Sequence, residues 1–130
     1  MFSHVAVGTN DLEKAKQFYD AVLGTLGYGE GISDDNEQRR RYVYRAETAL
    51  FIITQPLDGR PATHANGGTI GFTCKSAVEV DLWHAAGVAN GGRSVENPPG
   101  VRDTKDARLY LAYLRDPDDN KLSALYREPC

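Results

Sequence analysis

Apolar and polar positions follow the same order twice along the chain. Residues 2–7 alternate and are typical of a half-buried strand. A helix is predicted next, because apolar residues then recur at helical spacing: Leu12, Ala15, Phe18, Tyr19, Val22, Leu23 and Leu26. Asn10 precedes Glu13 by three residues, which resembles a capping box, and Gly24 and Gly27 end the helix. Strands are expected at residues 28–33, 39–45 and 48–55.

The second copy begins with a strand over residues 69–74. Ser76 and Glu79 repeat the capping box, and Val80, Trp83 and Ala86 form the inner face of a second helix. Gly91 and Gly92 end it. The remaining segments are a short strand at 93–95, a loop at 96–107, and two strands at 109–115 and 121–127 around a turn. Each copy therefore reads β-α-β-β-β.

This repeat predicts one domain over residues 1–130, with module one at about 1–60 and module two at about 67–130. The connector, residues 56–68, has the glycines and prolines of a loop. We expect the functional site to lie where the two modules face each other.

Composition narrows the possible functions. The chain is 41% apolar and 25% charged, with a formal net charge of −3. These values favour a folded domain and argue against nucleic-acid binding. No apolar run has the roughly 20 residues that span a bilayer. Cys74 and Cys130 do not make a secreted disulfide framework, and no leader precedes the first strand. We therefore expect a cytoplasmic protein with no membrane partner.

Three segments carry a resemblance to a known family: His4 in the first strand, residues 11–28 (DLEKAKQFYDAVLGTLGY), and residues 115–126 (RDPDDNKLSALY). Together they resemble the vicinal oxygen chelate superfamily, which contains glyoxalase I (lactoylglutathione lyase), extradiol dioxygenases and bleomycin resistance proteins. Asp119 stands where that family usually has glycine. The resemblance implies an α+β fold in which two paired modules form a curved eight-stranded mixed sheet around a cleft, with helices on the outer face. It also implies a homodimer.

Metal-dependent members of that family hold a divalent ion on up to four ligands from the first and last strands of each module. The matching positions here are His4, Ile52, Thr69 and Ser123. One imidazole without carboxylate partners does not retain such an ion. We therefore predict no metal and no other cofactor; the alternative is a divalent metal held by donors from unexpected places, such as Glu47, Glu96 or Asp103.

Strand alternation predicts which side chains line the cleft if His4 faces it. Phe2 and Ala6 then share its face, as do Gly71 and Leu125 in module two. The predicted ligand-binding residues are His4, Tyr42, Leu50, Ile52, Thr54, Thr69, Thr73 and Ser123, and His4 is the candidate catalytic residue.

The run Arg39-Arg40-Arg41 continues as an alternating strand. Alternation places Arg39, Arg41, Val43 and Arg45 on one side and Arg40, Tyr42 and Tyr44 on the other. The arginines either bind a ligand carboxylate or phosphate by paired hydrogen bonds, or they are solvent-exposed charges that discourage pairing at the edge of the strand.

These observations favour a glyoxalase/bleomycin-resistance-like protein that binds a small organic molecule without a metal. It either sequesters that molecule or acts on it by metal-free chemistry. The alternative is a metal-dependent lyase, epimerase or dioxygenase of the same superfamily. A third interpretation, an interaction module with a closed interior, requires that His4 and Ser123 line no open cavity.

Overall fold

The computed structural model describes residues 1–129, and Cys130 lies outside the described residues. The first module contains β1 (His4–Gly8), α1 (Leu12–Gly24), β2 (Ile32–Ser33), β3 (Arg41–Arg45) and β4 (Leu50–Thr54). Its strands form a sheet in the order β1-β4-β3-β2, in which β1 runs parallel to β4 and the other pairs are antiparallel.

The second module contains β5 (Ile70–Thr73), α2 (Ala77–Ala89), β6 (Arg93–Ser94), β7 (Gly100–Asp103), β8 (Arg108–Arg115) and β9 (Lys121–Arg127). The order β5-β9-β8-β6, with β5 parallel to β9, matches the first sheet strand for strand. The repeated β-α-β-β-β order read from the sequence is thus present in both modules.

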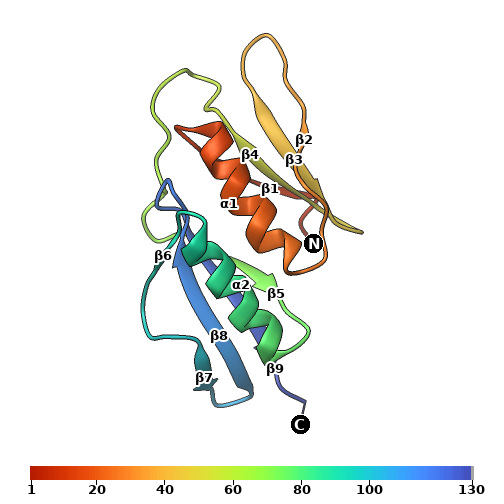
Figure 1. Cartoon of the computed structure of the whole chain (residues 1–130), viewed down its shortest axis with the longest axis vertical. Coiled ribbons are helices and arrows are strands. Elements are labelled where there is room, and N and C mark those ends of the chain that lie inside the picture. Colours follow the sequence, from red (N-terminus) through yellow and green to blue (C-terminus); the bar gives the residue numbers. More distant parts are fainter. Residues whose placement is uncertain (130) are drawn as a thin grey trace.

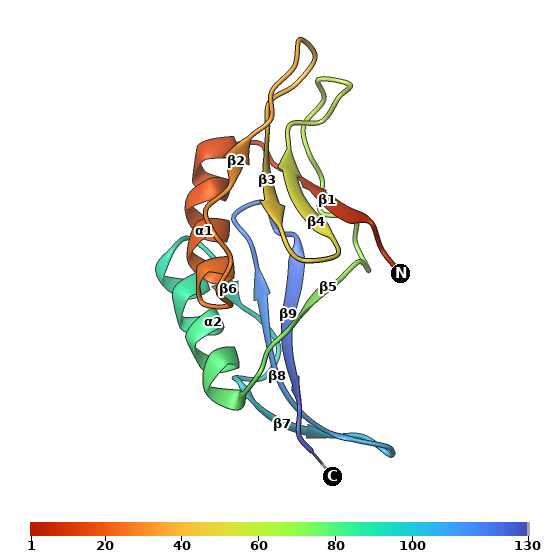
Figure 2. The same ribbon diagram turned by 90° about the vertical axis from the view of Figure 1, so that its right-hand side faces the viewer.

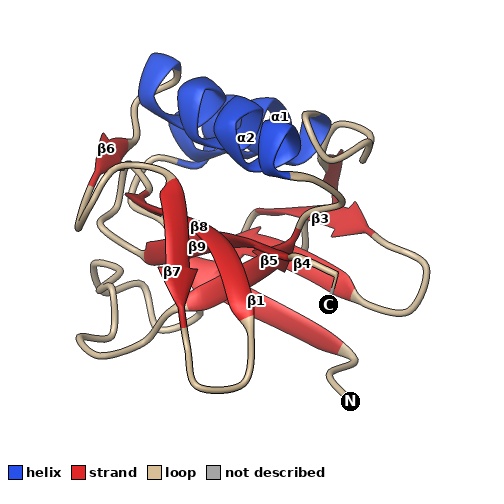
Figure 3. Cartoon of the chain, turned by 90° about the horizontal axis from the view of Figure 1, so that it is seen from below, coloured by secondary structure: helices blue, strands red, loops and turns tan. Residues whose placement is uncertain are grey.

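Both helices lie side by side on one face of the two sheets, and the other face is left without helices (Figures 1 and 3). The α+β class is confirmed. Residues 1–129 contain nine strands in two separately hydrogen-bonded sheets, where the sequence predicted eight in one. The additional strand, β7, lies within the expected loop 96–107 and pairs only with β8. This strand has only four residues, alternates between half-buried and exposed positions, and follows two prolines. Its sequence therefore gives little indication of a strand.

The two helices start differently. Ser76 caps α2 as predicted, since its hydroxyl accepts the Glu79 amide at 3.1 Å. In α1 the cap is Asp11, which accepts the Lys14 amide, so the prediction of Asn10 is wrong by one residue. Asn10 instead holds the connector: its side-chain oxygen accepts the Ala62 amide at 2.7 Å and its side-chain nitrogen donates to the Ala62 carbonyl.

The core fills the space between the helices and the inner face of both sheets. Phe18, Tyr19, Val80 and Trp83 are fully buried there, as the helical spacing predicted. The two helices approach closely at Gly87 of α2, where an added Cβ would lie 3.2 Å from Val22 and 3.3 Å from Phe18 of α1 and would overlap Leu114 of β8.

A buried carboxylate joins the two modules. Asp116, in the turn between β8 and β9, is 3% exposed. Its Oδ2 accepts the Tyr19 hydroxyl of α1 at 2.5 Å and the Asn120 side-chain amide at 2.9 Å. Asn120 also donates to the carbonyl of Gly8, at the end of β1, at 3.1 Å. The turn therefore reaches up beside the first module (Figure 2).

The residues of this turn account for much of the family resemblance of segment 115–126, and their roles there are structural. Oδ1 of Asp116 accepts the backbone amides of Asp118 and Asn120, both at 2.9 Å. The φ angle of Asp119 is 68°. This left-handed conformation favours glycine, and aspartate tolerates it. The Asp119 carboxylate accepts from Arg93 at 2.9 Å.

We predict that Tyr19→Phe lowers the free energy of unfolding by about 1.5–3 kcal/mol, the usual contribution of a hydrogen bond to a charged group. Burial and the Asp116 carboxylate raise the pKa of Tyr19 well above its ordinary value, so the hydroxyl stays protonated and donates at neutral pH. Urea denaturation monitored by circular dichroism measures the change. The exposed Tyr28→Phe is the control; equal losses in both variants would contradict a special role for the Tyr19 bond.

Candidate functional site

Strand alternation separates two faces of the first sheet. Val5, Val7, Phe51 and Ile53 point toward the helices and belong to or pack against the core. The intervening side chains therefore point to the helix-free side, here called the outward face. In β1 and β4 these are His4, Ala6, Leu50, Ile52 and Thr54.

A hollow of about 410 Å³ lies on this outward face and is here called the first-sheet hollow. Ile52 is only 5% exposed although it lies outside the core cluster, so it is part of a buried floor. Arg41 borders the hollow and is already paired: its Nε and one terminal nitrogen donate to Asp34 Oδ2 at 2.8 and 2.5 Å. The lining residues are Ile32, Ser33, Asp34, Arg41, Val43, Arg45, Leu50 and Ile52.

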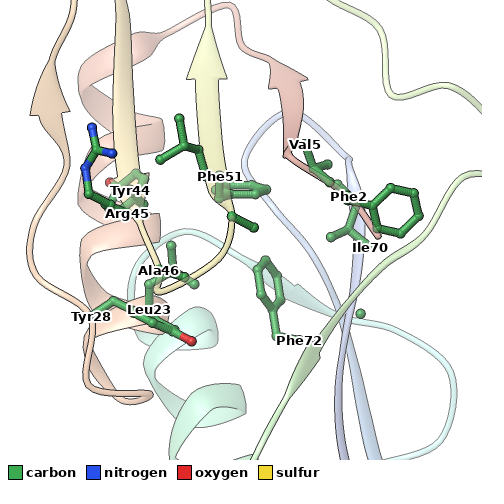
Figure 4. Close-up of a pocket in the computed structure, with 13 residues that line it drawn as sticks. Phe2, Val5, Leu23, Tyr28, Tyr44, Arg45, Ala46, Phe51, Ile70 and Phe72 are labelled. Atoms are coloured by element: carbon green, nitrogen blue, oxygen red, sulfur yellow. The ribbon is translucent and has the colours of Figure 1, made fainter.

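A second hollow, here called the junction pocket, lies where the end of the first sheet meets β5 (Figure 4). Its volume is about 200 Å³ and its lining is almost entirely apolar. Phe51 of β4 and Phe72 of β5 meet there edge to face, with ring centroids 5.5 Å apart. Val5, Ile70 and the N-terminal Phe2 line the side toward β1, and Ala46, Ala49 and Tyr28 line the other side.

Arg45 and Leu50 line both hollows, which therefore adjoin. The two residues are register partners on β3 and β4. In Figure 4 the guanidinium of Arg45 points away from Phe72 and up along β3, and strand alternation places this side chain on the outward face. No carboxylate within the described residues pairs with Arg45.

The predicted residues of module two lie on the outward face of the second sheet. Gly71 pairs with Ser123 and Thr73 pairs with Leu125, while their neighbours Ile70, Phe72, Leu122 and Ala124 face the core. Thr69 precedes β5 and is exposed. The structure thus divides the predicted set between two sheets: His4, Leu50, Ile52 and Thr54 lie on the first, and Thr73 and Ser123 lie on the second, with Thr69 just before it.

Tyr42 is on the wrong face for the predicted site. It pairs with Ile53 on β4 and points toward α1, where its hydroxyl donates to Glu13 at 2.8 Å. That hydrogen bond is the main cause of the raised pKa of Tyr42. Alternation had placed Tyr42 opposite Arg41 and Arg45, but it did not show which of these two sides faces the cleft.

His4, the candidate catalytic residue, is exposed at the start of β1. Its Nδ1 lies 2.8 Å from the hydroxyl of the neighbouring Ser3. It is not among the residues that line either hollow described above.

The side chains at the expected metal-ligand positions do not fit a divalent ion. Besides His4, the strands β1, β4, β5 and β9 contain no Asp, Glu, Asn, Gln, His or Cys. Throughout residues 1–129 no group of three or more His, Cys, Asp or Glu side chains is placed to hold a metal ion. A hard or borderline cation needs several such donors, so no chemical step is assigned to a metal here.

The outward face is instead cationic. Arg41, Arg45, Arg115 and Lys121 all lie on it, although the whole chain has a net charge of −3. Lys121 is paired with Glu96 and lies over the ring of Tyr113, 5.0 Å from its centroid. Arg115 donates to the Asp119 carbonyl at 2.7 Å. Arg45 differs from these neighbours because its guanidinium donates to no side-chain or backbone acceptor in the described chain.

The sequence did not predict the junction pocket. Its walls come from six separate segments, and only Phe2, Leu50 and Gly71 among them had been assigned to a cleft face. Strand alternation placed Arg45 on the same side as Arg41 and Val43, but it did not show which face of the sheet that side is.

Comparison with known families and structures agrees with this fold. A family model of the Glyoxalase/Bleomycin resistance protein/Dioxygenase superfamily matches residues 1–123, and the chain belongs to that superfamily. A glyoxalase/bleomycin resistance protein from Albidiferax ferrireducens T118 is 57% identical, with 98% of this chain and 99% of that chain covered and a TM-score of 0.91. No functionally curated protein matches.

More distant structures share the fold. A glyoxylase/bleomycin resistance protein/dioxygenase domain from Frankia sp. EAN1pec is 15% identical, covering 97% of this chain and 96% of that one, with a TM-score of 0.71. Lactoylglutathione lyase from Agrobacterium tumefaciens is 20% identical, covering 94% and 90%, with a TM-score of 0.63. Neither helix of the described chain has the length and apolar character needed to cross a membrane.

Proposed function

We propose that this protein binds a small organic molecule at the first-sheet hollow, which lies on the outward face, and at the adjoining junction pocket between the two modules. The observation that carries the proposal is the shared border of the two hollows at Arg45 and Leu50. An apolar recess next to a few polar groups is the usual composition of a small-molecule site. The chain then either sequesters its ligand or converts it by metal-free chemistry.

The proposal includes binding without the metal ion of other superfamily members. It is supported by the chemistry of the side chains: isoleucine and serine offer no replacement for the carboxylates that offset the charge of a divalent ion. Ser123 lies against Gly71, where an added Cβ would be 3.0 Å from its hydroxyl oxygen, so a larger donor at either position would need the strands to adjust.

We expect dialysis against zinc, nickel, manganese or ferrous iron, followed by elemental analysis, to leave substoichiometric metal on the protein. The expected residual metal is the same in the wild type and in His4→Ala, because a single imidazole binds weakly. One equivalent of metal per chain that disappears in His4→Ala would overturn the metal-free part of the proposal.

A thermal-shift screen against small metabolites and antibiotics is expected to find compounds that raise the Tm, since a ligand at 100 times its Kd stabilises the native state by about 2.7 kcal/mol. Ala49→Trp, which fills the junction pocket, should abolish the shift. Ala85→Trp, on the exposed side of α2, should retain it. Equal shifts in both variants would place the ligand elsewhere. Mass spectrometry of the recovered compound separates sequestration from conversion.

We further propose a homodimer in this function. No helix of the described chain covers the outward faces of the two sheets (Figure 3). Phe2 and Ile32, which lie outside the core, are 69% and 65% exposed. Large exposed apolar side chains of this kind mark interaction surfaces. Sedimentation equilibrium should give twice the chain mass of 14.3 kDa, and Phe2→Glu with Ile32→Glu should shift the protein toward monomer. A monomeric wild type would contradict this proposal.

A further inference from the structure

We infer that the ligand is an organic carboxylate: an apolar ring or short hydrocarbon body seated in the junction pocket, linked by a short chain to a carboxylate held by Arg45. This inference rests on the proposed function and specifies the chemical class of the ligand. It follows from the contrast between the two hollows and from the unoccupied charge at their common border.

The junction pocket selects the apolar part. Phe51, Phe72, Ile70 and Val5 line it with hydrocarbon, and neither ring has a polar group to offer. Figure 4 shows these side chains converging on the gap between β4 and β5 from both modules. Its volume of about 200 Å³ exceeds that of apolar cavities of about 150 Å³ that accept benzene. One ring or an equivalent aliphatic group therefore fits.

Arg45 selects the charged part. A guanidinium recognises a carboxylate through two parallel hydrogen bonds, and these bonds are stronger than neutral ones. Arg41 in the same hollow is already satisfied by Asp34, whereas Arg45 has no such partner in the described chain. A ligand carboxylate would supply the missing anion without breaking an existing ion pair.

The position of Arg45 sets the distance between the two parts. Arg45 lines both hollows, and its guanidinium points away from Phe72 (Figure 4). A carboxylate attached directly to a ring buried in the pocket would not reach that charge as readily as one on a short flexible chain. The pair 4-phenylbutyrate and 4-phenyl-1-butanol has this shape, and the two compounds differ in the charge of the terminal group.

NMR titration of the ¹⁵N-labelled protein measures both affinities at neutral pH. We expect both compounds to shift the amide resonances of Ala49, Gly71 and Phe72, and 4-phenylbutyrate to bind about tenfold more tightly, as expected for one hydrogen-bonded charge pair. Arg45→Gln should reduce the butyrate affinity to that of the alcohol and leave the alcohol unchanged. Arg127→Gln, which removes another exposed and unpaired arginine of the described chain, should change neither.

The outcomes separate this inference from the proposed function. Equal affinity for the two compounds, or an unchanged butyrate affinity in Arg45→Gln, overturns the carboxylate assignment while small-molecule binding in the pocket stands. Shifts that appear with neither compound, or only far from the junction pocket, overturn both.

Discussion

The buried carboxylate of Asp116 is the contact on which the arrangement of the two modules depends. It lies in the second module, yet it accepts a hydrogen bond from Tyr19 in the first, and Asn120 beside it reaches the end of β1. Burial raises the pKa of Asp116, and its hydrogen bonds oppose that rise. A carboxyl group with this little water around it requires several donors at once. Because those donors come from both modules, satisfying Asp116 also fixes where β5 lies relative to the first sheet.

That relative position creates the junction pocket. Phe51 and Phe72 belong to different modules and meet only because the modules are docked. The alternation of each strand then separates two sets of side chains: one fills the core under the helices, and the other faces outward. Neighbouring side chains of a strand point to opposite faces of the sheet. Tyr44 is therefore buried, and its hydroxyl donates to Asp20 at 2.7 Å, while Arg45 points outward. The same strands therefore contribute to the core and to the site, each through a different set of side chains.

Local pattern was sufficient to predict the repeat, the inner faces of both helices and the bounds of β9, because each depends on neighbouring residues. It failed at Asn10, whose side chain bonds the distant Ala62, and at β7, whose only strand partner in the described chain is β8. It also assigned Tyr42 to the cleft, because alternation alone does not show which side of a strand faces the helices. The junction pocket is a product of docking between distant segments, and no spacing within one segment encodes it. The positions matching metal ligands were identifiable only through resemblance, and the structure shows that they lie on two different sheets.

In each sheet the first strand of the module along the chain pairs with the last one. His4 pairs with Leu50 and Ile70 with Leu122, so β1 and β5 gain their backbone partners only when the rest of their module has been formed. Closing such long segments costs chain entropy before the contact adds any stability, and topologies dominated by distant pairings fold slowly for their length. During synthesis β1 emerges first and waits for β4. Until then the unpaired edge of β1 is exposed to association with other chains.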